Sequence, residues 1–354
     1  VTEWNLLPGS SPRFTATNPS GTEVFFTEYG SNKIAKLNVI NNTITEWDIL
    51  QNSTEPYGIS YHSESGKIVY TIAGGIGIHR IGVLDPTINK ITEYIISTSS
   101  VGTIDTVIDS ENAIWFTAGS GANSLRDIYK LDIGPDLNQT IGTITRYNIN
   151  TPEGNILNQI HGIDVISIPD PNPESEGNEI NLVFVGSGIE QSKTSIGLVD
   201  HEISQFERIG MLIPDFEQFT YYDLPEKGAT PAVVSADSNG NIWFGESGAN
   251  KIGVIAPREP LFEDEPTVLT QWAIPTDNSD PFHISVRPGT DIVFFTEYQT
   301  GKIGRLDPNT NIITEWLLPQ GVVRPAGISF DNSDNMFIVA EGSEQILKIT
   351  RSQT

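Results

Sequence analysis

The chain has 354 residues, with 20 lysines and arginines against 45 aspartates and glutamates, so its formal net charge at pH 7 is −25. Such a charge repels the phosphates of nucleic acids and anionic membrane surfaces, which argues against nucleic acid as a partner. The absence of cysteine excludes a disulfide scaffold and a thiolate nucleophile, and no apolar stretch is long enough to span a bilayer.

A strand-like phrase that ends in an aromatic residue returns along the chain. In chain order, its best copies are residues 1–4, 44–47, 91–94 and 313–316. The aromatic residues of neighbouring copies are 43 to 47 residues apart, which is the length of one four-stranded blade of a β-propeller. Seven units of this length fit into the chain.

The unit that starts at Pro281 shows the pattern of a full blade. After this proline, residues 291–297 (DIVFFTE) are predicted as the second strand, 302–307 (KIGRLD) as the third and 312–316 (IITEW) as the fourth. Proline, asparagine and aspartate at 307–311 predict a hairpin turn between the last two strands.

We therefore predict an all-β chain that forms a single seven-bladed β-propeller over residues 1–354. The blades are expected to begin near Pro12, Pro56, Gly102, Gln159, Pro231, Pro281 and Pro325. The last unit supplies only three strands, so residues 1–4 are predicted to complete blade seven and close the ring, which leaves no open sheet edge.

Glutamates recur at the ends of the predicted second strands. The innermost strand of a blade starts, and the second strand ends, on the same face of the ring, so these residues are expected to line one mouth of the central channel. In blade order they are Glu28, Ile72, Ala118, Gly186, Glu246, Glu297 and Glu341. Four clustered carboxylates predict a site for a hard cation such as Mg²⁺ or Ca²⁺. Alternatively, each glutamate only accepts backbone hydrogen bonds or pairs with Arg13 or Arg324.

Motifs of the form Glu-Pro-x-Gly-Ile, Trp-Phe-Thr-Glu, Asn-Lys-Ile-Gly-Arg-Leu and Ile-Thr-Glu-Trp recur in fixed order. Together they resemble the streptogramin B lyase (virginiamycin B lyase) family of seven-bladed propellers, over most of the chain. Lyases of this family open a cyclic depsipeptide antibiotic by Mg²⁺-dependent elimination at an ester bond. The resemblance therefore implies a cation that polarises the ester and a base that removes an α proton.

The catalytic histidines that the resemblance implies are displaced or replaced. Tyr57 follows Glu55 and Pro56 where the family has a histidine, and His283 comes one residue late after Asp280. A shift of one residue turns a strand side chain to the other face of the sheet, so a core or loop position is the alternative for this histidine. The resulting candidates are His283 and His161 as catalytic residues, and Glu55, Tyr57, Asp280 and Phe282 as ligand-binding residues.

Two classes of function remain open. A scaffold that binds a small molecule, peptide or protein is favoured, because the catalytic histidine and glutamate set is not reproduced. The alternative is a divalent-cation-dependent lyase or hydrolase that acts on a cyclic ester.

Three insertions and three glycosylation sequons bear on the partner and the location. The insertions, residues 134–140, 170–179 and 200–222, interrupt the repeat and are candidate partner-binding loops. The sequons begin at Asn41, Asn52 and Asn138, and the chain does not start with Met, which is typical of a trimmed mature protein. These features predict a secreted or cell-surface protein.

Overall fold

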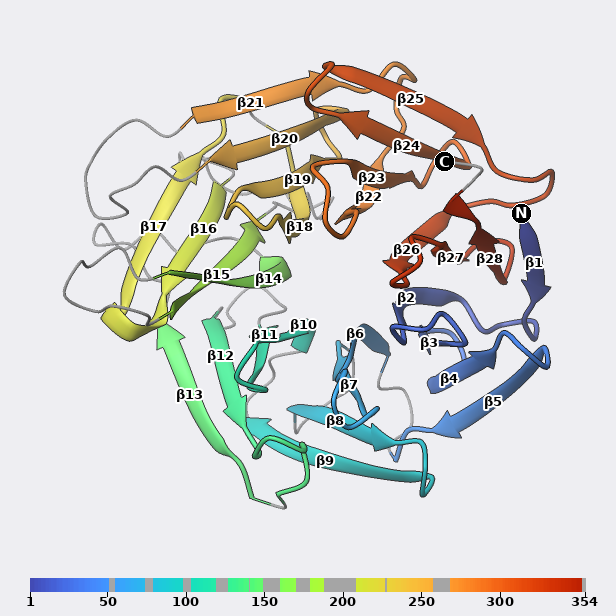
Figure 1. Ribbon diagram of the computed structural model, residues 1–354, viewed down its shortest axis with the longest axis vertical. Coiled ribbons are helices and arrows are strands. Elements are labelled where there is room, and N and C mark those ends of the chain that lie inside the picture. The colour runs from blue at the N-terminus through green and yellow to red at the C-terminus, as the bar shows by residue number, and fades with distance from the viewer. Residues whose placement is uncertain are drawn as a thin grey trace, which may run out of the picture.

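The computed structural model describes residues 1–50, 55–73, 79–97, 103–118, 127–139, 141–148, 160–169, 179–187, 208–226, 228–256 and 268–351. In these residues the chain forms seven antiparallel four-stranded sheets arranged as a ring (Figure 1). The sheets are the blades of a β-propeller, which confirms the predicted fold class. One short 3₁₀ turn, Pro214–Phe216, is the helical element of this part of the chain, and no described helix is long and apolar enough to cross a membrane.

Each blade runs from an innermost strand outward. The innermost strands are β2 (Pro12–Thr17), β6 (Pro56–Tyr61), β10 (Thr103–Ile108), β14 (Ile160–Pro169), β18 (Pro231–Ala236), β22 (Pro281–Val286) and β26 (Pro325–Phe330). The second strands are β3 (Glu23–Glu28), β7 (Ile68–Ile72), β11 (Ile114–Ala118), β15 (Glu179–Ser187), β19 (Ile242–Glu246), β23 (Val293–Glu297) and β27 (Met336–Ala340). The third strands are β4 (Lys33–Asn38), β8 (His79–Asp85), β12 (Asp127–Asp132), β16 (Arg208–Ile213), β20 (Lys251–Ala256), β24 (Lys302–Asp307) and β28 (Gln345–Ile349). The outer strands are β5 (Thr43–Asp48), β9 (Lys90–Ser97), β13 (Thr143–Asn148), β17 (Gln218–Asp223), β21 (Val268–Ala273), β25 (Ile312–Leu317) and β1 (Thr2–Asn5).

The second strands form the core between blades. In β7, β11, β19, β23 and β27 every residue is buried, because neighbouring blades cover both faces of these strands. A strand covered on both faces has a continuous apolar run rather than an alternating pattern. Large side chains such as Tyr70, Trp115 and Phe295 fill the space between sheets and are fully buried.

The N-terminal strand closes the ring, as predicted. β1 pairs with β28 in antiparallel register, with Trp4 opposite Ile346, and the sheet order of blade seven is β1-β28-β27-β26. The N-terminal end of the chain lies beside this blade (Figure 1). The backbone groups of β28 are therefore paired on both sides, and no strand edge is left open at the point of closure.

An outer-strand tryptophan joins blades seven, one and five to the blade that follows each of them. Its indole N–H donates to the side-chain oxygen of an asparagine in the hairpin turn of the following blade. The pairs are Trp4 with Asn42 (2.8 Å), Trp47 with Asn89 (3.0 Å) and Trp272 with Asn311 (2.9 Å). Each of these asparagines has a positive φ, which asparagine tolerates better than most residues. The Ile-Thr-Glu-Trp phrase thus serves as a connection between blades.

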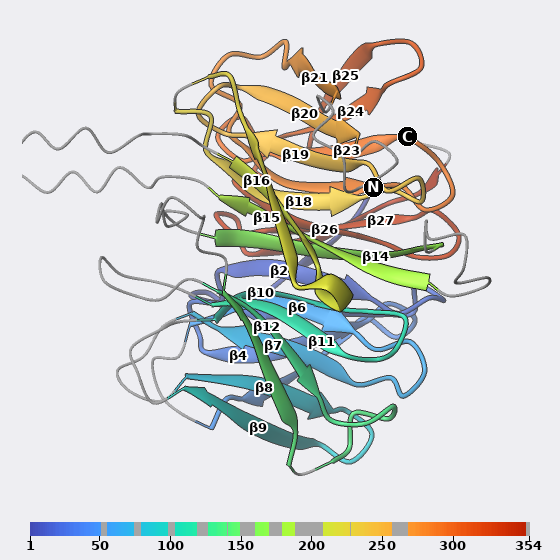
Figure 2. The same ribbon diagram turned by 90° about the vertical axis from the view of Figure 1, so that its left-hand side faces the viewer.

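The innermost strands run along the axis of the ring (Figure 2). In all seven blades the register with the second strand shifts between the first and fourth residue of the innermost strand. This irregularity is a β-bulge, which re-aims the side chains of the second and third residues. We name the end where these strands begin the proline mouth, and the end where they finish the serine mouth.

We expect the Trp47→Phe substitution to lower the free energy of unfolding by about 1 kcal/mol, because it removes one inter-blade hydrogen bond and leaves the Asn89 oxygen without its donor. Urea denaturation followed by circular dichroism measures this loss. The matched control is Trp316→Phe, the same position in blade six, whose indole donates no hydrogen bond to the described residues. Equal losses in both variants would assign the effect to ring volume instead.

Candidate functional site

The proline mouth is built on a strained backbone position that repeats around the ring. The residue before each starting proline has φ between 43° and 55°, in the left-handed region that costs a non-glycine residue about 1–2 kcal/mol. These residues are Ser11, Glu55, Thr230, Asp280 and Arg324. In four of the blades the carbonyl of this residue accepts the backbone N–H of the residue that follows the second strand, at 2.9 to 3.2 Å. The strained turn therefore places the residue after the second strand at the mouth.

Arg13 occupies the centre of an aromatic cluster at this mouth. Its guanidinium carbon lies 4.8 Å from the ring centre of Tyr29, 5.1 Å from that of Tyr57 and 5.7 Å from that of Phe282. Cation–π attraction of this kind is worth about 0.5–2 kcal/mol for each well-placed ring. The Phe282 ring in turn stacks on Tyr298, with the ring centres 5.0 Å apart.

Glu341 anchors the cluster from blade seven. Its Oε2 is 3.3 Å from Nη2 of Arg13 and accepts the Tyr298 hydroxyl at 2.8 Å. Burial acts to lower the pKa of Arg13, but Tyr57 and Glu341 outweigh it and hold that pKa above its usual value. Burial raises the pKa of Tyr57 to about 12, so both partners of this contact keep their protons at neutral pH. We name Arg13, Tyr29, Tyr57, Phe282, Tyr298 and Glu341 the Arg13 cluster.

The four residues predicted to bind a ligand lie in or beside this cluster. Tyr57 and Phe282 belong to it. Burial, together with the nearby Glu55 carboxylate, raises the pKa of the Tyr29 hydroxyl, which places Glu55 next to the cluster. Asp280 lies on the rim, where its Oδ2 accepts from Gln299 at 3.3 Å.

His283 lies below the cluster, on the third residue of β22. Its ring centre is 5.2 Å from that of Phe14, a residue of blade one, and its Nδ1 is buried without a hydrogen-bond partner in the described residues. Burial lowers the pKa of His283 to about 4, so the imidazole is neutral at physiological pH. The bulge in β22 turns this residue toward the axis, where it meets a ring from a blade that is not its neighbour.

The glutamates predicted as metal ligands have partners inside their own blades. Glu28 accepts from the Ser31 hydroxyl at 2.5 Å, Glu246 from the Gln271 amide at 2.7 Å and Glu297 from the Thr300 hydroxyl at 2.8 Å. All three carboxylates are buried. Their partners lie on turns and outer strands, away from the axis of the ring.

The surroundings of Glu297 show why this carboxylate suits a structural role. Burial raises the pKa of Glu297 to about 7, and the adjacent Glu315 adds to the rise by repulsion and a shared hydrogen bond. The Lys302 ammonium is 3.5 Å from Glu315 and supplies the positive charge that a metal ion would otherwise bring. Across the described residues no group of three or more histidines, aspartates and glutamates is arranged to hold a metal ion.

The strand register corrects the position assigned to Glu341. Pro325 pairs with Ala340, as Pro12 pairs with Glu28 and Pro281 with Glu297, so Ala340 is the true counterpart of these glutamates. In blade four the counterpart is Ser187, where Gly186 was expected. Glu341 stands one residue later, at the place of Tyr29 and Tyr298, and a shift of one residue turns its side chain to the mouth. The glutamates therefore do not form one set.

The second candidate histidine and two of the insertions fall largely outside the described residues. The backbone at His161 is part of β14, but its side chain is not among those the structure describes. Asn52, residues 170–178 and residues 200–207 of the third insertion lie outside the described residues altogether.

Two half-buried carboxylates on the axis side, Asp105 and Asp164, were not anticipated from the sequence. Asp105 accepts the backbone N–H of its neighbour Thr106 at 2.9 Å and that of Ile163 in the next blade at 3.3 Å. Asp164 likewise accepts from Val165 at 2.8 Å and from Ala236 in blade five at 2.7 Å. Burial raises the pKa of Asp105 to about 7 and that of Asp164 to about 6. These side chains join the innermost strands of adjacent blades.

From the sequence we also did not predict that Arg13 lies at the centre of the cluster or that Tyr29 and Tyr298 belong to it. A signal existed, since Arg13, Tyr57 and Phe282 share the second position of the innermost strand. Tyr29, Tyr298 and Glu341 share the position just after the second strand. Large or charged side chains at two corresponding positions of three or more blades indicate a gathered site in a repeat protein.

The fold and this mouth define a seven-bladed β-propeller with an aromatic, arginine-centred opening. Residues 201–354 match the virginiamycin B lyase family. A streptogramin B lyase structure is similar at 23% identity and a TM-score of 0.71, covering 98% of this chain and 96% of the other. No curated protein matches the chain in sequence.

Two further solved structures share the fold. One is a catalytically inactive virginiamycin B lyase from Staphylococcus aureus with Quinupristin, at 22% identity and a TM-score of 0.73, covering 99% of this chain and 98% of the other. The other is the Cps50 (Swd1) β-propeller domain of Myceliophteria thermophila, at 7% identity and a TM-score of 0.69, covering 99% of each chain. The resemblance to the streptogramin lyases is confirmed, at the level of the fold and of the family match over residues 201–354.

We expect the Glu297→Gln substitution to stabilise the protein progressively as the pH rises from 5 to 8. The folded state holds the Glu297 proton up to about pH 7, whereas the unfolded chain releases it near 4.5, so wild-type stability falls across this window. The variant does not titrate there, and its advantage should grow by about 1–2 kcal/mol. Urea denaturation at several pH values measures it, with Glu226→Gln, a carboxylate paired to Lys251 at the surface, as control. A constant difference between variant and wild type would contradict the assigned pKa.

We expect the His283→Phe substitution to stabilise the protein progressively as the pH falls, which is the reverse of the pH dependence expected for Glu297→Gln. Between pH 6.5 and 4 the unfolded chain binds a proton on this histidine that the folded protein does not, so the wild type loses stability as the pH falls. The variant keeps a ring against Phe14 and should gain about 1–2 kcal/mol over the wild type between pH 7 and pH 5. Thermal unfolding at these pH values measures the gain. If wild type and variant respond alike, His283 is reached by solvent in the folded protein.

Proposed function

We propose that this protein is a binding propeller that holds a small, peptide-like molecule with aromatic groups at the proline mouth. The observation that carries the proposal is the Arg13 cluster. It gathers four aromatic rings and one ion pair from blades one, two, six and seven at one end of the axis. Pockets that bind small molecules combine aromatic surface with a few convergent polar groups in this way.

The chemistry of the cluster suits a ligand that carries rings and carbonyl groups. The Arg13 side chain is about one fifth exposed, so its guanidinium can donate to a carbonyl oxygen while the aromatic rings stack on the ligand. Arg324 lies 5.9 Å from the ring centre of Tyr298 and adds a second donor at the rim. The similar fold of a virginiamycin B lyase structure that contains Quinupristin supports a molecule of this class.

Binding without cleavage is favoured by the residues that replace the expected catalytic set. Tyr57 and Phe282 stand where the family pattern has histidine, and the pKa of Tyr57, about 12, makes it a poor base at neutral pH. Glu28, Glu246 and Glu297 are engaged within their own blades. The mouth therefore offers recognition groups more readily than a base and a metal site.

Calorimetric titration of quinupristin into the protein tests the proposal. We expect saturable binding that the Arg13→Ala and Phe282→Ala variants weaken about tenfold or more, since each removes a ring contact or a charge-assisted hydrogen bond. Arg305→Ala, which removes an arginine paired with Asp307 on blade six, is the matched control and should bind as the wild type does. Liquid chromatography with fragmentation mass spectrometry after incubation should recover the cyclic form, which differs from an opened isomer in retention and fragments although the two have the same mass. Equal binding by all variants would refute a site at the Arg13 cluster.

The second candidate is a lyase that acts on a cyclic ester with Mg²⁺ or Ca²⁺. It rests on the resemblance and on the neutral imidazole of His283, whose buried Nδ1 has no hydrogen-bond partner in the described residues. In this case quinupristin would gain a double bond and a free carboxylate without change in mass, only when the cation is present. Loss of this product in His283→Phe, together with loss of cation binding in Glu297→Gln, would establish the lyase over the scaffold.

The location of the protein is part of the same proposal. We infer a secreted or cell-surface protein from the acidic composition and the three sequons, of which Asn41 is exposed in the turn before β5. A peptide or protein bound at the mouth or at the insertion loops is the corresponding partner class, since loops on a rigid scaffold often carry binding.

A further inference from the structure

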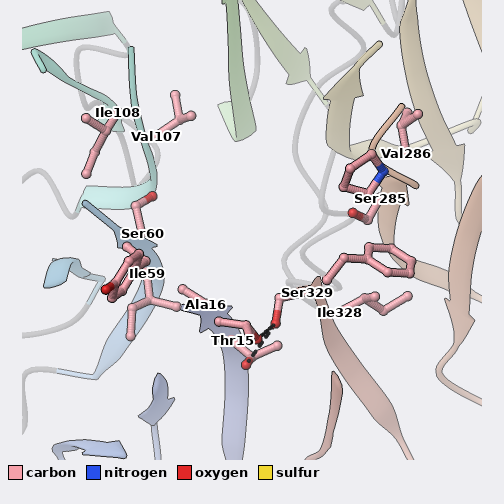
Figure 3. A pocket seen from close by; sticks show the side chains of 14 residues that line it. Thr15, Ala16, Ile59, Ser60, Val107, Ile108, Ser285, Val286, Ile328 and Ser329 are labelled. Atoms are coloured by element: carbon pink, nitrogen blue, oxygen red, sulfur yellow. Dashed lines mark hydrogen bonds between the residues drawn. The ribbon is translucent and has the colours of Figure 1, made fainter. Parts of the chain in front are cut away.

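A cavity lies at the serine mouth, at the other end of the innermost strands from the Arg13 cluster. Its volume is about 350 Å³, and it is lined by 14 residues from blades one, two, three, six and seven (Figure 3). Almost all of them come from the last three positions of an innermost strand. This cavity shares no residue with the Arg13 cluster, whose innermost-strand members Arg13, Tyr57 and Phe282 occupy the second position.

The lining of the cavity contains no charged side chain. Five residues carry a serine or threonine hydroxyl, Tyr61 carries a phenol, and the rest are apolar. Ser60 and Ser285 lie on opposite sides of the open space, with Ile59, Val107 and Val286 among the apolar side chains around it (Figure 3). In a chain with a net charge of −25, an uncharged lining over this area is a distinct chemical environment.

The repeat explains this lining. The register places a small residue at the fifth position of nearly every innermost strand: Ala16, Ser60, Val107, Asp164, Ser235, Ser285 and Ser329. The one charged member, Asp164, is not part of the lining, and its two oxygens accept backbone N–H groups at 2.8 and 2.7 Å. Small side chains at one level leave the space near the axis unfilled.

Aromatic rings separate this cavity from the proline mouth. Phe14, at the third position of β2, is buried, and its ring centre lies 5.0 Å from that of Tyr57 and 5.2 Å from that of His283. These rings belong to blades one, two and six. Phe14 directly precedes Thr15, the first lining residue of β2, so the rings lie on the proline-mouth side of the cavity. The cavity is consequently open to solvent at the serine mouth and bounded by rings on the inner side.

The hydroxyls of the lining differ in how far they are already engaged. Ser329 hydrogen-bonds with Thr17 at 2.5 Å, as dashed lines show in Figure 3, and Ser60 donates to the carbonyl of Thr106 at 2.7 Å. The Ser285 hydroxyl makes no hydrogen bond with the described residues, although it faces the cavity. The Tyr61 phenol likewise makes no hydrogen bond with the described residues, so these two hydroxyls remain available to a bound molecule.

We propose that the serine mouth is a binding site for an uncharged small molecule with an apolar ring body and one hydrogen-bonding group. An ionised ligand would lose hydration there without gaining a counter-charge, which is costly. The cavity volume falls in the lower range of small-molecule pockets, about 300–1,000 Å³. Ser285 would hold the polar group of the ligand, and Ile59, Val107 and Val286 would contact its rings.

Two fluorescent probes that share the same aromatic rings but differ in charge test whether the site disfavours an ionised ligand. N-phenyl-1-naphthylamine is uncharged and has one N–H, and anilinonaphthalenesulfonate adds a sulfonate to these rings. We expect saturable one-to-one binding of the uncharged probe, and binding of the sulfonate weaker by about tenfold or more, which corresponds to about 1.4 kcal/mol. Equal or tighter binding of the sulfonate would overturn the proposal, as would no binding of the uncharged probe.

Variants locate the probe. Ser285→Trp fills the cavity and should reduce affinity for the uncharged probe by about tenfold or more, whereas Ser285→Ala, which keeps the space, should reduce it about threefold. The control Ser20→Trp adds the same side chain to an exposed turn and should not change the affinity. Arg13→Ala should leave it unchanged too, so failure at this site and failure at the Arg13 cluster are distinguishable. If Ser285→Trp does not fold, undiminished binding by Ser285→Ala would itself contradict the role of this hydroxyl.

Discussion

The backbone ladder between β1 and β28 is the constraint on which the rest of the structure depends. Without it blade seven would have three strands and an open edge, and the contacts across the boundary between blades seven and one would have no fixed geometry. Arg13 and Glu341 are 328 residues apart in the chain, yet their side chains form an ion pair at 3.3 Å. Phe14 of blade one also meets His283 of blade six. Ring closure therefore positions the proline mouth as well as stabilising the sheet.

The bulge near the start of each innermost strand lets one short strand serve two different surfaces. Side chains before and within the bulge reach the proline mouth and the axis, where Arg13, Tyr57, Phe282 and His283 gather. Side chains after it return to regular alternation and present hydroxyls at the serine mouth. The charged and aromatic side chains of the proline mouth are thereby separated from the uncharged lining of the serine mouth by the length of one innermost strand. Since a fold of this kind supports many activities, function has to be argued from these surfaces.

Some of the acidic side chains lie inside the molecule. In blade six, Glu297 ends the second strand and Glu315 is the glutamate of the Ile-Thr-Glu-Trp phrase on the outer strand. Both carboxylates face the same side of the blade, beside Lys302. Asp105 and Asp164 join neighbouring innermost strands through backbone N–H groups. The oxygens of Asp105 and Asp164 accept these backbone hydrogen bonds, whereas Oε1 of Glu297 is buried without a partner in the described residues and burial favours the protonated form of this group.

The sequence alone determined the blade length, the seven-fold repeat and the closing role of residues 1–4, because apolar runs, turn residues and their spacing are local properties that one repeat copies from another. It also marked Tyr57 and Phe282 as mouth residues. Only the tertiary structure decided which glutamates share a face, because a register difference of one residue separates Glu341 from Ala340 and reverses the side-chain direction. The ion pair between Arg13 and Glu341 depends on packing between blades that are far apart in the sequence. The same is true of the cavity that small side chains leave at the serine mouth. Local sequence patterns do not specify which residues of different blades come into contact.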